Sequence, residues 1–167
     1  EGAAEVEALV DGPVGAVEVT GTVRLAEGQV LDRPVENLRL SIDGVLRSAS
    51  RLTAQITGTG ALDAEPLSLS AEMDMAGEAL GLRALDLTLA GTRATGGVVR
   101  GLDGLLAGDL EIESTNLSPL AALALVEAQG AGDITLRLRR QEGGQGVSLV
   151  GALQNVAAFD QSIEALD

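Results

Sequence analysis

The chain contains no cysteine, histidine, lysine, tryptophan or tyrosine, and its single aromatic residue is Phe159. Without cysteine it forms no disulfide, no thiolate nucleophile and no cysteine-ligated zinc or iron–sulfur site. Without histidine it lacks the most common general base and the most common transition-metal ligand. Because neither a Ser–His nor a Cys–His pair can form, we expect a protein that is not an enzyme and that uses no cofactor.

Positive charge is also scarce. Asp and Glu number 25 against 11 basic residues, all of them arginine, and the formal net charge is −14. This balance opposes binding to nucleic acid, which needs clustered basic residues, and it opposes docking on anionic lipid headgroups. Arg137, Arg139 and Arg140 form the only basic cluster in the sequence. We interpret this cluster as a solvated face, with contact to an acidic partner segment as the alternative.

What the chain does have is alternation of aliphatic and polar residues in short segments, most clearly from Leu67 to Met75. Successive side chains of a strand point to opposite faces, so this period of two predicts strands with one apolar and one wet face. With 46% hydrophobic residues the chain is expected to fold. The segments predicted as strands are 17–25, 35–46, 52–62, 67–75, 82–91, 98–102, 106–114, 133–139 and 147–153.

Turn-forming residues separate these segments. Glu27-Gly28, Asp43-Gly44, Gly96-Gly97 and Asp103-Gly104 are typical of turns. The strands recur at roughly 10 to 20 residues, as in antiparallel hairpins, and no fixed repeat indicates a solenoid. The sequence therefore predicts a mainly β fold, an antiparallel meander, as one β-rich segment over residues 1–167.

One segment departs from the strand pattern. Ser118 and Pro119 suit an N-cap and a first helical position, and Gly130 suits a C-cap. The residues between them have high helix propensity. We predict one short α-helix over 119–129 that packs on the sheet. No apolar run is long enough to span a bilayer.

Two patterns suggest binding sites, and each has a simpler interpretation. Gly58-Thr59-Gly60 begins like a dinucleotide-binding motif but lacks the third glycine and the following helix. Asp109, Glu111 and Glu113 alternate along one strand and could face a divalent cation, but a solvated face explains them as well. We predict no metal site.

An aliphatic sheet face without catalytic groups is typical of a lipid-contacting surface. The side chains predicted to contact lipid along this groove are Leu67, Leu69, Met73, Met75, Leu85, Leu87, Leu89, Leu110, Ile112, Ile134, Leu136, Leu138, Val147 and Leu149. Their lining has no hydrogen-bonding anchor, so we expect weak, unspecific binding of phospholipid acyl chains.

The segments 116–123 (Asn-Leu-Ser-Pro-Leu-Ala-Ala-Leu) and 130–138 (Gly-Ala-Gly-Asp-Ile-Thr-Leu-Arg-Leu) resemble the periplasmic region of the TamB family of AsmA-like bacterial envelope proteins. The resemblance covers roughly residues 52–155. It implies a sheet curled into an open, β-taco-like trough with an apolar lining. It also implies a protein anchored in the inner membrane that crosses the periplasm. Family members are linked to phospholipid transport and, with the outer-membrane barrel TamA, to outer-membrane protein assembly. We expect this chain to be a fragment of such a protein.

Two other interpretations stay open, and a third is disfavoured. A structural β-module could use its strand edges to contact client outer-membrane proteins. A closed β-sandwich or adhesin-like domain would bury the same apolar faces in a filled interior. A transmembrane barrel is disfavoured because aromatic girdles are missing.

Overall fold

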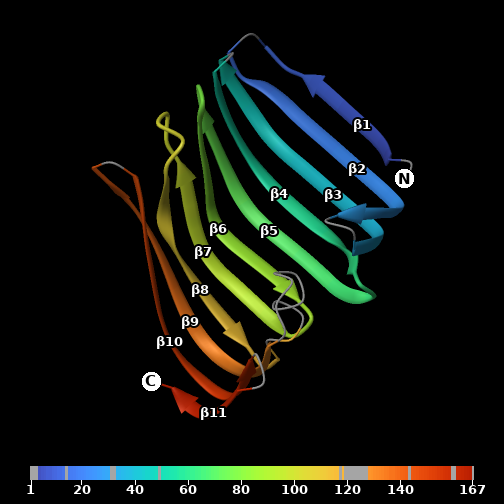
Figure 1. Cartoon of the computed structure of the whole chain (residues 1–167). Helices are drawn as coiled ribbons and strands as arrows, with labels where there is room; N and C mark the ends of the chain where they lie inside the picture. The colour runs from blue at the N-terminus through green and yellow to red at the C-terminus, as the bar shows by residue number, and fades with distance from the viewer. Residues whose placement is uncertain are drawn as a thin grey trace.

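The computed structural model describes residues 4–13, 15–30, 33–48, 50–116, 118, 128–142, 144–158 and 161–166. These residues form a single antiparallel sheet of eleven strands whose spatial order follows the sequence from β1 to β11 (Figure 1). The strands are β1 (Ala4–Asp11), β2 (Val17–Val30), β3 (Arg33–Ser48), β4 (Arg51–Leu62), β5 (Glu65–Ala76), β6 (Ala79–Leu89), β7 (Thr92–Arg100), β8 (Leu106–Ser114), β9 (Ala128–Gln141), β10 (Gly144–Ala158) and β11 (Gln161–Leu166).

The sheet is open. β1 and β11 lie at its two edges and do not pair with each other, and the strands bow together into a curved ribbon (Figure 1). No second layer of strands or helices packs on it among the described residues. The mainly β, antiparallel prediction is confirmed, and the closed β-sandwich alternative is wrong for this part of the chain.

The strand registers place the aliphatic residues on one face. Cross-strand partners point to the same side of a sheet, so a row of partners identifies a face. One such row runs through Leu87 of β6, Ala94 of β7, Ile112 of β8, Ile134 of β9 and Gly151 of β10. We call the side of the sheet that carries this row the apolar face and the opposite side the charged face.

Two bulges keep aliphatic residues on the apolar face where strict alternation would turn them away. Ala84, with a φ of 46°, lies in a bulge of β6 that leaves both Leu82 and Leu85 on this face, three positions apart. In β3, Asn37 has a φ of 51° and lies in a second bulge, which leaves both Val35 and Leu38 on the apolar face. An extra residue in one strand shifts the phase of every later side chain, which is how the face stays continuous.

Three of the four predicted turns are interior strand positions. Asp43-Gly44 lies within β3, because Gly44 pairs with Ala54 of β4 and a Cβ on Gly44 would sit 2.6 Å from the Ala54 Cβ. Gly96-Gly97 lies within β7 and pairs with Leu110 and Asp109 of β8. Their glycines allow neighbouring strands to approach closely. Glu27-Gly28 likewise lies inside β2, whereas Asp103-Gly104 is a turn as predicted.

The predicted helix over 119–129 is not borne out. Ala128 and Gln129 belong to β9 and pair with Ala158 and Ala157 of β10. Residues 119–127 lie outside the described residues. The helix propensity of the sequence is a local preference, and at 128–129 pairing with β10 overrides it.

Few side chains are buried, because in a single-layer sheet each side chain is shielded only by its neighbours on the same face. The buried hydrophobic residues are Val35, Ala54, Ala71, Leu89 and Leu138, and no described side chain is less than 2% exposed. The accessible surface is 10768 Å², whereas a compact 16.9 kDa protein is expected to expose roughly 7,700 Å². About 3,000 Å² therefore remains accessible that a two-layer fold would cover.

A buried hydroxyl pair lies where β7 meets β8. Thr92 and Ser114 are 4% and 7% exposed, they are cross-strand partners, and their hydroxyl oxygens are 2.7 Å apart. Thr92→Val should lower the free energy of unfolding by about 1–3 kcal/mol, because it leaves the Ser114 hydroxyl without that partner. The double variant Thr92→Val/Ser114→Ala should recover part of this loss. Urea unfolding followed by far-UV circular dichroism measures both, and simple additivity of the single losses would contradict the coupling.

Candidate functional site: the apolar face

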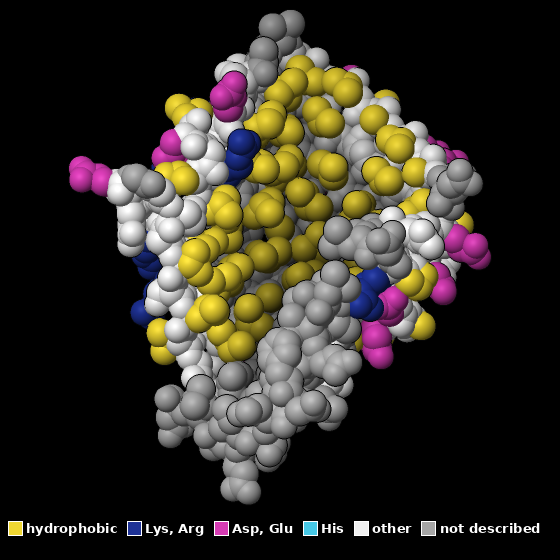
Figure 2. All heavy atoms as spheres, in the orientation of Figure 1, with side chains coloured by type: hydrophobic (Ala, Val, Ile, Leu, Met, Phe, Trp, Pro, Cys, Tyr) yellow, Lys and Arg dark blue, Asp and Glu magenta, His cyan; other side chains and the backbone are white. Residues whose placement is uncertain are grey.

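The apolar face is hollowed and aliphatic. In Figure 2 hydrophobic side chains gather in the hollow of the sheet, and Asp, Glu and Arg side chains lie around its margin. This arrangement follows from the strand registers, because the alternating aliphatic positions of successive strands face the same side. The hollow therefore offers a continuous hydrocarbon surface to a ligand.

All fourteen side chains predicted to contact lipid lie on this face. On β5 and β6 the cross-strand partners are Leu67–Leu89 and Leu69–Leu87. Met73 and Met75 pair with Leu82 and Leu80, and Leu85 pairs with Gly96. On β8, β9 and β10 the partners run Leu110–Leu136–Leu149, Ile112–Ile134 and Leu138–Val147. The structure thus brings the predicted set together on one side of the sheet.

The sequence prediction missed part of the face. β2, β3 and β4 extend it through Val19, Val23, Leu40, Ile42 and Ile56. These residues alternate as clearly as those of β5, so the period-two signal that identified the other positions applies to them as well. The apolar face is therefore continuous from β1 to β10.

Exposure increases towards the edges of the sheet. Leu89 and Leu138 are 7% and 9% exposed, whereas Val147 and Leu149 of β10 are 61% and 66% exposed. On the opposite edge strand, Val6 and Val10 of β1 are 68% and 62% exposed. Exposed apolar area of this extent on a folded protein marks an interaction surface.

The charged face carries cross-strand ion pairs. Arg24 contacts Glu5 and Glu7 of β1, at 3.5 and 3.2 Å, and Arg83 contacts Asp74 at 3.7 Å. Arg137 and Arg139 both contact Asp109, at 3.9 and 2.8 Å. These two members of the basic cluster are paired across strands on the charged face. Arg140 is two positions beyond Leu138 and so faces the other side of the sheet.

The best-formed of these ion pairs joins β6 and β7. The Nε and Nη2 atoms of Arg93 donate to the two carboxylate oxygens of Asp86, at 3.0 and 2.6 Å. These hydrogen bonds lower the pKa of the Asp86 carboxyl, with the charge of Arg93 contributing and slight burial opposing. Because both groups are exposed, the pair adds little to stability.

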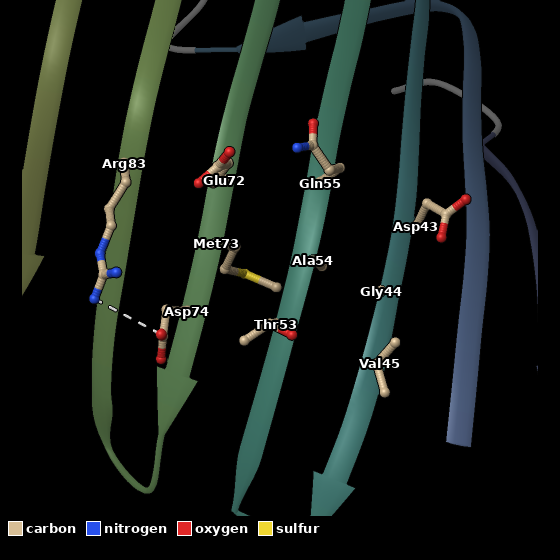
Figure 3. A pocket seen from close by; sticks show the side chains of 10 residues that line it. All are labelled: Asp43, Gly44, Val45, Thr53, Ala54, Gln55, Glu72, Met73, Asp74 and Arg83. Atoms are coloured by element: carbon tan, nitrogen blue, oxygen red, sulfur yellow. Dashed lines mark ion pairs between the residues drawn. The ribbon is translucent and has the colours of Figure 1, made fainter. Parts of the chain in front are cut away.

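A shallow depression of about 330 Å³ lies on the charged face, across β3 to β6 (Figure 3). Its polar side chains include Asp43, Gln55, Glu72 and Asp74, and Arg83 forms its ion pair with Asp74 at the margin. The bulge of β6 next to Arg83 bends the sheet at this point. Within the described ranges, no three metal-ligating side chains come together here or elsewhere.

Comparison with known proteins returns nothing: no family model, curated protein or solved structure matches the chain. In the described part of the chain, no helix is both long and apolar enough to cross a membrane.

Proposed function

We propose that this chain is a hydrophobic-groove segment of a bridge-like protein that carries phospholipid acyl chains across the periplasm, as the resemblance to the TamB family implies. One observation supports it above all. The sheet is a single layer whose aliphatic face is hollowed and left uncovered by the described residues. A hydrocarbon tail on this face leaves water, at a gain of about 0.8 kcal/mol for each buried CH₂ group.

The dimensions of the face suit an acyl chain. Neighbouring strands lie about 4.8 Å apart, so a tail about 15 Å long, half of a bilayer core, spans only three or four strands when it crosses them. The face runs over ten strands, from β1 to β10. A lining without fixed polar anchors binds many tails weakly, which allows a tail to move along it.

In this proposal the segment is β-taco-like, open along its length, and it belongs to a protein anchored in the inner membrane. It performs no catalysis and needs no cofactor. Contact with an outer-membrane barrel similar to TamA belongs to the full-length protein.

Leu149 and Val150 of β10 provide a matched test. They are adjacent and similarly exposed, at 66% and 59%, but Leu149 lies on the apolar face and Val150 on the charged face. Leu149→Asp should reduce the phospholipid that co-purifies with the protein, measured by native mass spectrometry, about tenfold, because burying a leucine side chain contributes about 1.5–3 kcal/mol. Val150→Asp adds the same charge and should leave the bound lipid unchanged.

Two outcomes would contradict the lipid proposal. Equal loss in both variants would show that charge alone matters, whichever face carries it. A lipid-free dimer of the wild-type protein would show that a second copy covers the apolar face instead.

One observation supports the alternative, assembly-related function. All eight residues of β1 are exposed, and none of the described strands pairs with its outer edge. An unpaired edge strand offers backbone donors and acceptors to another extended segment. Crosslinks from β1 to client barrel strands, together with lipid-free native mass spectra, would favour this function over lipid transport.

A further inference from the structure

Arg100 and Arg140 lie at one end of the apolar face. Arg100 follows Val98 on β7 by two positions, and Arg140 follows Leu138 on β9 by two, so both point to the apolar side of the sheet. Val98 and Leu138 flank the same residue of the strand between them, Gly108 of β8. β7 and β9 lie two strand spacings apart, or about 10 Å. Long arginine side chains can reach one ligand from both positions.

The two guanidinium groups lie beside the same turn, which joins β7 to β8. The Cζ and Nη2 atoms of Arg140 lie 2.6 Å from the position that a Cβ on Gly101 would take. The Nη2 atom of Arg100 lies 3.8 Å from the corresponding position on Gly104. These glycines are joined by a hydrogen bond of 3.0 Å from the Gly104 N–H to the Gly101 carbonyl. Because Gly101 has no side chain, the Arg140 guanidinium lies in space that a Cβ at this position would occupy.

Both arginines are exposed and lack a carboxylate partner. Within the part of the chain that the structure describes, neither forms an ion pair or a side-chain hydrogen bond. The carboxylate on the same turn, Asp103, accepts a hydrogen bond from the Leu105 N–H at 3.0 Å. Its Oδ1 lies 2.7 Å from the same Gly101 Cβ position as the Arg140 guanidinium, but among the described residues it forms no ion pair with either arginine. Acidic residues are in large excess in this chain, so two unpaired arginines do not reflect a shortage of partners.

We propose that Arg100 and Arg140 bind the phosphate of a lipid whose acyl chain lies on the apolar face. This inference rests on the proposed function and adds a headgroup position to it. Guanidinium groups donate paired hydrogen bonds that match phosphate oxygens. The nine residues of β8 span about 30 Å. A tail of about 15 Å that starts at the arginines and runs along the strand therefore passes Leu106 and reaches Leu110.

The charge of the whole chain does not oppose this site. A net charge of −14 repels the protein from an anionic bilayer surface, whose field acts on all charges within a Debye length. A single lipid phosphate at this site instead interacts mainly with its nearest charged neighbours, two guanidinium groups and the Asp103 carboxylate, which together leave one positive charge. The site can therefore bind the phosphate of a single lipid molecule, even though an anionic bilayer surface repels the whole chain.

The test compares amphiphiles that share a tail and differ in the headgroup. Wild-type protein is loaded with the neutral apolar dye N-phenyl-1-naphthylamine, and dodecyl phosphate or dodecyl maltoside is titrated to displace it. We expect dodecyl phosphate to compete at about tenfold lower concentration, and Arg100→Gln/Arg140→Gln to abolish that preference with dodecyl maltoside unaffected. Arg39→Gln/Arg51→Gln is the matched control and should keep the preference. It removes two arginines that lie on the charged face and that form no ion pair within the described part of the chain.

The outcomes separate this site from the proposed function. A preference for phosphate that survives in Arg100→Gln/Arg140→Gln, or is absent from the wild type, overturns the headgroup site while lipid binding stands. Failure of both amphiphiles to displace the dye overturns the proposed function itself. Inorganic phosphate should not displace the dye or weaken dodecyl phosphate binding at equal concentration. Competition by inorganic phosphate would identify a free-phosphate site and overturn the lipid assignment.

Discussion

Replacing Leu87 and Leu110 with aspartate should abolish lipid binding while the sheet stays folded. Leu87 pairs with Leu69 and Ala94, and Leu110 pairs with Gly96 and Leu136, so both lie within the apolar face. A tail lying across β6 to β8 would have to desolvate a carboxylate, at an effective penalty of several kcal/mol for each ion. We expect at least a hundredfold weaker displacement of an apolar dye by dodecyl maltoside.

The fold should tolerate these changes because both leucines are partly exposed, and a carboxylate there can remain hydrated. Thr88→Asp/Ser148→Asp is the matched control. It adds the same charge on the charged face, where Thr88 and Ser148 pair with Arg93 and Arg137. Circular dichroism should give all three proteins the same strand content. Wild-type lipid binding by the Leu87→Asp/Leu110→Asp protein would count against an acyl-chain groove.

Gly96→Ala should be among the most destabilising single substitutions in the chain, at about 2–4 kcal/mol. Gly96 has a φ of 135°, a conformation that residues with side chains rarely adopt, and an added Cβ would collide with the Asp109 carbonyl oxygen of β8. The Cα of Leu110 would lie only 3.1 Å away. Relief of this contact would force β7 and β8 apart in the middle of the sheet.

Gly144→Ala is the control for this prediction. Gly144 begins β10, and a Cβ added there would meet no atom within 4 Å. Its replacement should change the free energy of unfolding by no more than about 1 kcal/mol. The urea midpoints of the two variants, followed by circular dichroism because the chain has no tryptophan or tyrosine, provide the comparison. Equal midpoints would show that β7 moves to accommodate the methyl group without cost.

The apolar face could be predicted from the sequence because period-two alternation is a local property of each strand. Leu67, Leu69 and Met73 follow it without interruption, and the structure places them together as the pattern requires. Strand order could also be anticipated, since short connections favour pairing between consecutive segments. Both features depend on residues close together in the chain.

Features that depend on neighbouring strands were not predictable in the same way. Asp43-Gly44 has the composition of a hairpin turn, but β3 continues through it because β2 and β4 pair on both sides. The bulge at Ala84 carries no turn signal, yet it sets the phase of Leu80 and Leu82 relative to Leu85. An uncovered face cannot be read from alternation at all, because a sandwich and a single layer have the same pattern.

The candidate headgroup site also combines one feature that the sequence predicts with one that depends on neighbouring strands. Alternation alone separates Arg140 from Arg137 and Arg139, since it is in phase with Leu138. Its position beside Arg100 depends on β7 and β9 flanking β8, which only the topology establishes. The basic cluster of the sequence therefore contains two different environments, the charged face for Arg137 and Arg139 and the apolar side for Arg140.

The uninterrupted order from β1 to β11 has a consequence for how such a protein is built. Among the described residues each strand contacts chiefly its immediate neighbours in the chain, and the two edge strands β1 and β11 do not pair with each other. Stability is then close to a sum of local hairpin contributions, as in solenoid architectures. Whole hairpins can be inserted or removed with little disturbance elsewhere, which makes length an independently adjustable property of this architecture.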